Sequence, residues 1–184
     1  MSSDISNQNQ QLQAKKNARA RYLLLLAAIL VLILTGDQTS KQLIVNSMQP
    51  GQSIPIWGET LRFTYVQNEG GAFSSSIGSN TRYIIFSIVI IALVIAVFFR
   101  KFGEHQTIDI AMATVLGGAF GNLIDRFRFE AVVDFIDMNI PDIDMLGIQM
   151  TRWPVYNIAD IAITVGIIVI ILSVLFTKPK TNPP

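Results

Sequence analysis

The sequence predicts an all-α membrane protein, a four-transmembrane-helix bundle with a small extracytoplasmic β element. Hydrophobic residues make up 51% and charged residues 15% of the 184 residues, and the mean hydropathy is +0.45. This composition does not suit a single soluble domain. The 14 Lys and Arg and 13 Asp and Glu side chains cluster in a few stretches and leave four long segments almost uncharged. A bilayer is therefore the expected solvent for those four segments.

The first membrane-spanning segment follows a polar tail. Residues 1–20 are rich in Gln, Asn and Ser without an apolar period, which predicts a disordered cytoplasmic tail. Residues 22–41 are the first expected span, which opens the membrane domain of residues 21–177. A basic region before an apolar run is also typical of a cleavable signal peptide. Since the run ends without a small-x-small cleavage site, a retained helix is the simpler interpretation.

A small β element is expected next, over residues 50–73. Aromatic and β-branched residues alternate with polar ones between Ile54 and Gln67, and Pro50-Gly51 and Gly58 indicate turns. The remaining elements are three apolar spans, an outer loop rich in Asp and Met, and a short cytoplasmic tail. In chain order they are residues 83–99, 108–125, 127–154 (the loop), 155–176 and 178–184 (the tail).

The distribution of basic residues predicts the orientation. Four spans place both termini on one side, and the segments on that side hold eight Lys and Arg against six on the other. Basic residues in short segments beside span ends favour the cytoplasm. Both termini should therefore be cytoplasmic, and most carboxylates then lie at the outer face.

Composition also excludes several classes of function. A net charge of +1 gives no basic field for nucleic acid, so no nucleic-acid partner is expected. Without cysteine, and with His105 as the single histidine, the chain offers no thiolate nucleophile and no multi-histidine metal site. Most metal and nucleophile chemistries are therefore excluded.

Ionisable side chains near the span ends are the candidate functional groups, because such groups are costly at membrane depth. Asp37 and Lys41 are spaced i, i+4, which suits either a structural ion pair or a role on the substrate side. Asn122, Asp125 and Arg126 share one helix face, so an amide, a carboxylate and a guanidinium should meet there. The preceding glycines, Gly117, Gly118 and Gly121, permit close approach by another helix or by a substrate.

Two further carboxylates suggest acid–base chemistry. Asp134 lies in an apolar setting shortly after the third span, and Asp160 lies at the outer end of the fourth, next to Asn157. Two carboxylates close together in a low-dielectric site cannot easily both ionise, so one keeps a proton while the other activates water. This is the chemistry of an aspartic peptidase. Two interfacial aspartates that only mark a boundary remain the alternative.

These segments, in this order, closely resemble the lipoprotein signal peptidases of the signal peptidase II family, over about Tyr22 to Phe176. The resemblance rests on five motifs in the family's order, which are Asp37 to Lys41, Asn68 to Phe73, Gly117 to Arg126, Val132 to Phe135 and Asn157 to Asp160. On its own, Asn68-Glu69-Gly70-Gly71 would indicate only a glycine-rich turn.

The resemblance implies an aspartic endopeptidase of the bacterial inner membrane that cleaves the signal peptide before a diacylglyceryl-modified cysteine, without a metal or cofactor. Its implied partners are lipid-modified prolipoproteins and membrane lipid, and we expect a monomer. The implied catalytic pair is Asp134 and Asp160. The implied substrate-binding or supporting residues are Asn68, Gly71, Gly118, Asn122, Asp125, Arg126, Asn157, Asp37 and Lys41.

The chain departs from the family pattern in a longer connection between the two aspartates, an N-terminal extension, and Tyr156 where Phe is common. Two other classes of protein remain as alternatives. Intramembrane Asp and Asn also build the ion paths of small proton-coupled transporters and channels. A non-enzymatic membrane assembly factor would use the same glycine packing motif.

Overall fold

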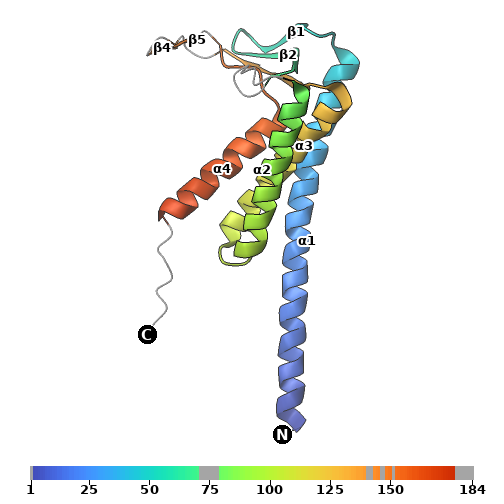
Figure 1. Ribbon diagram of the computed structural model, residues 1–184, viewed down its shortest axis with the longest axis vertical. Coiled ribbons are helices and arrows are strands. Elements are labelled where there is room, and N and C mark those ends of the chain that lie inside the picture. The colour runs from blue at the N-terminus through green and yellow to red at the C-terminus, as the bar shows by residue number, and fades with distance from the viewer. Residues whose placement is uncertain (1, 71–78, 140–142, 146–147, 151, 177–184) are drawn as a thin grey trace.

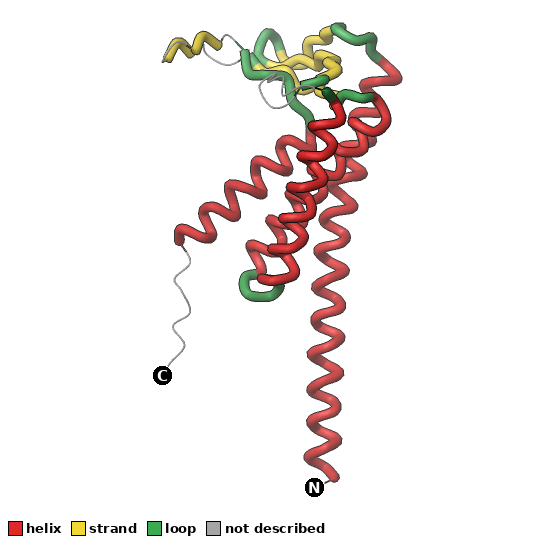
Figure 2. Tube along the Cα trace, in the orientation of Figure 1, coloured by secondary structure: helices red, strands yellow, loops and turns green. Residues whose placement is uncertain are grey.

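Four long helices and a small sheet form the fold. The computed structural model describes residues 2–70, 79–139, 143–145, 148–150 and 152–176. The helices, each long and apolar enough to cross a membrane, are α1 (Ser2–Ser47), α2 (Asn80–Lys101), α3 (Gln106–Phe129) and α4 (Ile158–Phe176). All strands gather at one end of the helices (Figures 1 and 2). This arrangement confirms the predicted fold class.

Helix α3 lies at the centre and packs against the other three helices. Its glycines explain how closely two of them approach. A Cβ at Gly117 would lie 3.0 Å from the backbone oxygen of Leu30 in α1, and a Cβ at Gly118 would lie 2.5 Å from that of Ala159 in α4. The glycines therefore serve helix packing on two sides of α3, as their spacing allows.

The N-terminal segment is helical, which differs from the prediction. Residues 1–20 were expected to be disordered, but α1 begins at Ser2 and extends the first span far beyond the other helices (Figure 1). The segment is rich in Gln, Ala, Lys and Arg, which have high helix propensity. Because the apolar span already nucleates the helix, adding these residues requires only propagation. Side chains from Ser6 to Ala20 are all exposed.

The larger sheet joins two segments that lie far apart in the sequence, one before α2 and one after α3. Strands β1 (Ser53–Trp57), β2 (Leu61–Asn68) and β3 (Val132–Met138) are antiparallel in the order β1-β2-β3. A separate hairpin pairs β4 (Ile143–Met145) with β5 (Ile148–Met150). The two strands within residues 50–68 confirm the expected β element.

The segment 127–154 was predicted as a loop, and this was wrong because it contains the end of α3 and three strands. Residues Ala131 to Phe135 are all buried, so β3 shows no alternation of apolar and polar residues. A strand buried on both faces lacks the period that identifies strands in a sequence. Helix α3 ends at Phe129, and its C-cap residue Glu130 has a left-handed backbone (φ 58°) shortly before β3 begins.

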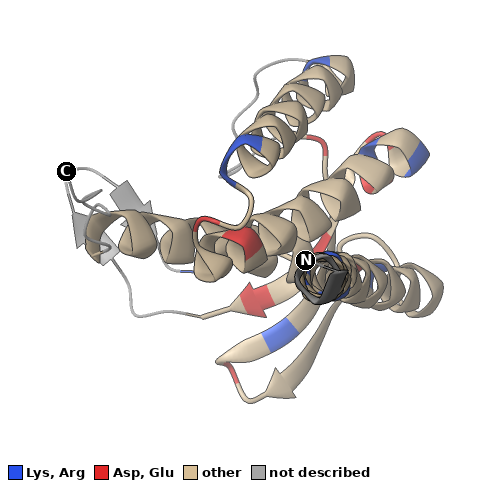
Figure 3. Ribbon diagram, turned by 90° about the horizontal axis from the view of Figure 1, so that it is seen from below, with Lys and Arg blue, Asp and Glu red and all other residues tan. Residues whose placement is uncertain are grey.

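In α2, α3 and α4 the charged residues lie near the helix ends, where the ribbon is blue or red in the view from below (Figure 3). Several charged side chains are buried at the strand end of the bundle. Asp37, Lys41 and Asp125 are at most 2% exposed. These buried charges surround the candidate site.

Candidate active site

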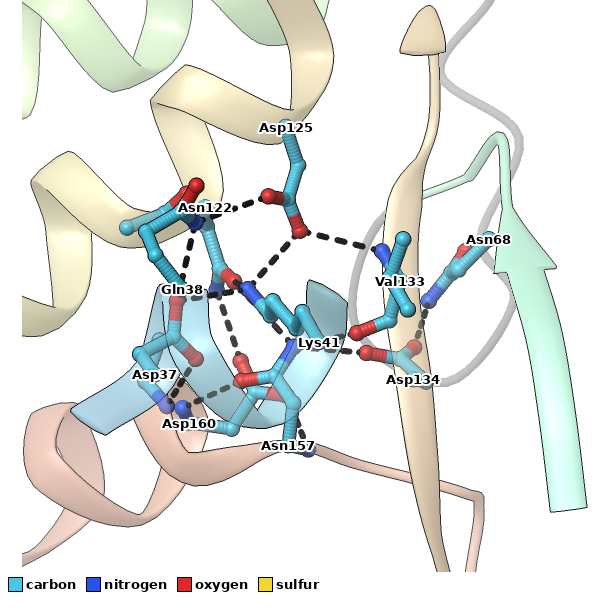
Figure 4. Close-up of polar contacts among 12 residues, drawn as sticks. Asp37, Gln38, Lys41, Asn68, Asn122, Asp125, Val133, Asp134, Asn157 and Asp160 are labelled. Carbon is cyan, nitrogen blue, oxygen red and sulfur yellow. Dashed lines mark hydrogen bonds and ion pairs between the residues drawn. The ribbon is translucent and has the colours of Figure 1, made fainter. Parts of the chain in front are cut away.

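Asp134 and Asp160 approach one another from different elements, as their shared partner Asn157 shows. Asp134 is 2% exposed on β3, and Asp160 belongs to the first turn of α4. The β3 strand brings Asp134 to this end of the bundle by pairing with β2, in register with Val66. Figure 4 shows these residues with the polar side chains of α1 and α3 around them. The sequence-predicted pair therefore lies in one site.

Asn157 hydrogen bonds to both carboxylates. Its Nδ2 donates to Oδ1 of Asp134 at 2.7 Å, and its backbone N–H donates to Oδ2 of Asp160 at 3.1 Å. In return, the backbone N–H of Asp160 donates to Oδ1 of Asn157 at 2.9 Å. The last two bonds form a reciprocal capping box at the start of α4. Helix capping therefore fixes the Asp160 side chain relative to Asn157.

Two more asparagines bind the remaining carboxylate oxygens. Asn68 Nδ2 donates to Oδ2 of Asp134 at 2.9 Å, and Asn122 Nδ2 donates to Oδ1 of Asp160 at 2.8 Å. Each of the four carboxylate oxygens thus accepts one hydrogen bond from an Asn residue. These partners match the sequence-predicted supporting residues Asn68, Asn122 and Asn157.

The environment shifts the acidity of Asp134. Burial, and then the negative charge of nearby Asp160, raises the pKa of the Asp134 carboxyl to about 7, against hydrogen bonds from Asn68 and Asn157 that lower it. At neutral pH or below, Asp134 therefore retains its proton to a large extent. One protonated and one ionised carboxyl is the state that general acid–base hydrolysis needs.

A buried lysine lies beside the carboxylate pair. Lys41 Nζ is 2.9 Å from Asp37 Oδ2 and 2.8 Å from Asp125 Oδ2, and it donates to Asn122 Oδ1 at 2.9 Å. The predicted i, i+4 pair of Asp37 and Lys41 is confirmed. With two carboxylates and an amide around one ammonium, the lysine has the full set of partners that a buried charge requires.

The two carboxylates that pair with Lys41 each accept a hydrogen bond from a backbone N–H next to Asp134 or Asp160. Asp37 Oδ1 accepts from the N–H of Ala159 at 2.9 Å, and Asp125 Oδ2 accepts from that of Val133 at 3.1 Å. Ala159 precedes Asp160 and Val133 precedes Asp134. Lys41 therefore couples α1 and α3 to both segments that carry the pair.

Gln38 is a site residue that sequence reasoning missed. Its Nε2 donates to Asp125 Oδ1 at 2.9 Å and to the backbone oxygen of Gly121 at 3.1 Å. It lies between Asp37 and Lys41 in the first motif, and that position was the available signal. These two partners lie more than 80 residues away in the sequence, so helix periodicity within one segment could not reveal them.

Arg126 has different contacts from Asn122 and Asp125, whereas the three side chains were expected to meet. Asn122 and Asp125 both bind Lys41, whereas Arg126 Nη2 donates to the backbone oxygen of Gly70 at 2.7 Å. A helix face is wide enough for i and i+4 residues to reach different neighbours. Gly71, also expected at the site, lies outside the described residues. Gly118 contributes by packing α3 against the first turn of α4.

The fold and the site together define a class of protein, a polytopic membrane protein with a carboxylate pair at one end of its helices, in which Asp134 is buried and Asp160 is half-buried. In the described ranges, no group of three or more His, Asp or Glu side chains converges as metal ligands would.

Comparison with known proteins identifies the family. The family model described as "Signal peptidase (SPase) II" matches residues 29–176, so the chain belongs to the signal peptidase II family of peptidases. The lipoprotein signal peptidase of Moorella thermoacetica is 39% identical over 79% of this chain and 88% of its own length. That of Desulforapulum autotrophicum is 34% identical over 86% and 96%.

Solved structures agree with this assignment. A structure described as "Bacterial membrane enzyme structure by the in meso method at 2.3 A resolution" superposes with a TM-score of 0.73 at 31% identity. The match covers 86% of this chain and 94% of that one. The chain is therefore a multi-pass membrane peptidase. All five motifs that indicated the family lie within residues 29–176, which the family model matches.

Proposed function

We propose that this protein removes the signal peptide from diacylglyceryl-modified prolipoproteins, cleaving just before the lipid-modified cysteine, with Asp134 and Asp160 as its catalytic pair. Family membership and the lipoprotein signal peptidases that match most of the chain support the reaction. The single observation that supports the pair is the side chain and backbone of Asn157, which bind both carboxylates at once. Such fixed, shared hydrogen bonds are what a two-carboxylate site needs.

The roles of the two carboxyls follow from their environments. Asp134, with a pKa raised to about 7 by burial and by Asp160, holds the proton. Asp160 accepts two hydrogen bonds, one of them from a backbone N–H at the start of α4, where the helix dipole favours a negative charge. Asp160 is then the general base and Asp134 the general acid.

The reaction proceeds in two balanced steps. Asp160 takes one proton from water while the water oxygen bonds to the scissile carbonyl carbon, and Asp134 gives its proton to the carbonyl oxygen. The resulting tetrahedral diol then loses the C–N bond. Asp160 returns its proton to the leaving amine of the lipid-modified cysteine, and Asp134 takes back a proton from a diol hydroxyl as the new carboxyl group forms.

The supporting residues act through this pair. Asp37, Lys41 and Asp125 hold the backbone beside each catalytic aspartate, while Asn68, Asn122 and Asn157 orient the carboxylates. Arg126, with a buried Nη1 that lacks a hydrogen-bond partner among the described residues, is the candidate donor to a substrate carbonyl. Gly71 belongs to this proposal through the family motif alone.

The proposed location of the reaction is the outer face of the membrane. The exposed basic residues of α1 before Tyr22 suit the cytoplasmic side, so the strands and the catalytic pair lie at the opposite, outer end. A signal helix anchored by its lipid-modified cysteine reaches water at that interface. Asn68, Asn122 and Asn157 of the same chain bind the two carboxylates, which supports the proposal of a monomer embedded in membrane lipid.

The test is cleavage of a synthetic prolipoprotein by the purified protein in detergent. One peptide carries the diacylglyceryl cysteine and its matched control carries an unmodified cysteine. We expect the modified peptide to be cut between the cysteine and the residue before it, with product masses that identify the bond, and the control to stay intact. Cleavage elsewhere, or equal cleavage of both peptides, would overturn the assigned substrate.

A further inference from the structure

The proposed function leaves one buried contact unexplained, the aromatic ring beneath Arg126. The guanidinium carbon of Arg126 lies 4.5 Å from the centroid of the Tyr83 ring, which comes from the first turns of α2. Tyr83 is 5% and Arg126 is 7% exposed, so the contact is shielded from water. A cation over an aromatic face is worth most where it is desolvated.

Arg126 also connects both flanks of the segment between β2 and α2. Its Nη2 donates to the backbone oxygen of Gly70 at 2.7 Å, after β2 ends. Asn80 Nδ2 donates to the backbone oxygen of Arg126 at 3.0 Å, where α2 begins. The orientation of the guanidinium is thus set by one hydrogen bond and one ring, neither of which neutralises its charge.

The unneutralised charge lies in the field of the catalytic pair. Arg126 interacts electrostatically with Asp134 and Asp160, and it forms no ion pair with either in the described part of the chain. Its buried Nη1 has no hydrogen-bond partner there. A buried charged donor without a hydrogen-bond partner is costly, so a ligand that accepts its hydrogen bond is the best explanation for it.

We infer that Tyr83 is a positioning residue for substrate, which acts by holding the Arg126 guanidinium so that Nη1 donates to a carbonyl oxygen of the lipid-modified substrate. The inference rests on the proposed function. An aromatic face suits this role because it attracts the cation without occupying an N–H group, whereas a carboxylate would bind the same donors that the substrate needs. Tyr83 therefore acts on substrate binding and leaves proton transfer to the aspartates.

The test is a kinetic comparison of ring variants on the lipid-modified prolipoprotein peptide. Tyr83→Phe keeps the aromatic face and should stay within about twofold of wild type, whereas Tyr83→Leu should raise KM about five- to thirtyfold with kcat nearly unchanged. Phe86→Leu is the matched control on α2, since Phe86 is 63% exposed, and it should not change KM. A fall in kcat at constant KM, or equal damage from Phe and Leu, would overturn the inference.

A second series of variants at position 83 changes the charge of the ring face without changing its shape. Phenylalanines with increasing ring fluorination, inserted at position 83, keep the shape of the ring while weakening its negative face. KM should rise stepwise along the series, and the steps should disappear when Arg126→Leu removes the cation. A flat series would contradict the inference. The proposed function is tested separately, because wild-type cleavage that is lost in Asp134→Asn supports it whatever the ring variants show.

Discussion

Asn157 and Asp160 hydrogen bond to each other in both directions, at 3.1 Å and 2.9 Å, and so make the proposed catalytic base part of the cap of α4. The same Asn157 side chain donates to Asp134 at 2.7 Å. A motif that stabilises a helix terminus therefore also sets the relation between the two carboxyls. This double use makes the two roles of Asn157 separable by mutation.

Asn157→Ser should separate capping from catalysis. Serine is a good N-cap and keeps the acceptor for the Asp160 N–H, but it lacks the amide donor that binds Asp134. We expect a loss of kcat of at least about tenfold. Both Asn157→Ser and Asn157→Ala lose the amide's hydrogen bonds to Asn122 and Val133, so the serine variant, which keeps the cap, should be the more stable of the two in detergent by about 1 kcal/mol. Equal kcat for Asn157→Ser and wild type would refute the orienting role.

Lys41→Met should destabilise the protein strongly. Its removal leaves Asp37 and Asp125 buried without their cation, and breaking a buried ion pair costs about 3–5 kcal/mol. The matched control is Lys101→Met, because Lys101 pairs with Glu104 at the surface and is 60% exposed. Thermal unfolding in detergent should show a large fall for the first variant and almost none for the second. Similar melting temperatures for the two would show that the buried network does not stabilise the fold.

Gly118→Ala should disturb the first turn of α4. The new Cβ would lie 2.5 Å from the backbone oxygen of Ala159, which neither residue can avoid without moving the helices apart. Such overpacking costs about 1–3 kcal/mol, and the shift carries Asp160 away from its partners. Gly36→Ala on α1 is the control, since nothing lies within 4 Å of its added methyl group. Cleavage should fall in the first variant only, when both are assayed at a temperature where they remain folded.

The pH profile should report the proton on Asp134. With a pKa near 7, Asp134 loses its proton as pH rises above that value, so kcat/KM should decline on the alkaline side. The folded state holds this proton more tightly than an unfolded aspartate of pKa 3.8. Stability relative to Asp134→Asn should therefore fall between about pH 4 and 7 and then level off. An activity that still rises through pH 9 would contradict the assignment of Asp134 as the acid.

The sequence predicted the parts of the site that local spacing controls. The four apolar spans followed from charge-free length, and the Asp37 to Lys41 ion pair followed from i, i+4 spacing. Tertiary pairing decided the rest. The β3 strand is buried on both faces and so shows no period, and Gln38 meets Asp125 only because α1 packs against α3.

Arg126 shows the same limit most clearly. The helical spacing predicted that Arg126 would meet Asn122 and Asp125. Its contacts are instead with Gly70 and Tyr83, which lie far from it in the sequence. The N-terminal helix was missed for another reason, because polar composition suggests disorder even where an adjacent span has already nucleated a helix.

The central claim is that Asp134 and Asp160 together perform the hydrolysis, and single-turnover cleavage of the lipid-modified peptide tests it most directly. Asp134→Asn and Asp160→Asn should each lower the rate by at least about a thousandfold while the protein stays folded in detergent. Asp137→Asn, three residues along β3 and bound to Thr64 and Arg152, should cleave at nearly the wild-type rate. Near-normal cleavage by either of the first two variants would contradict the account.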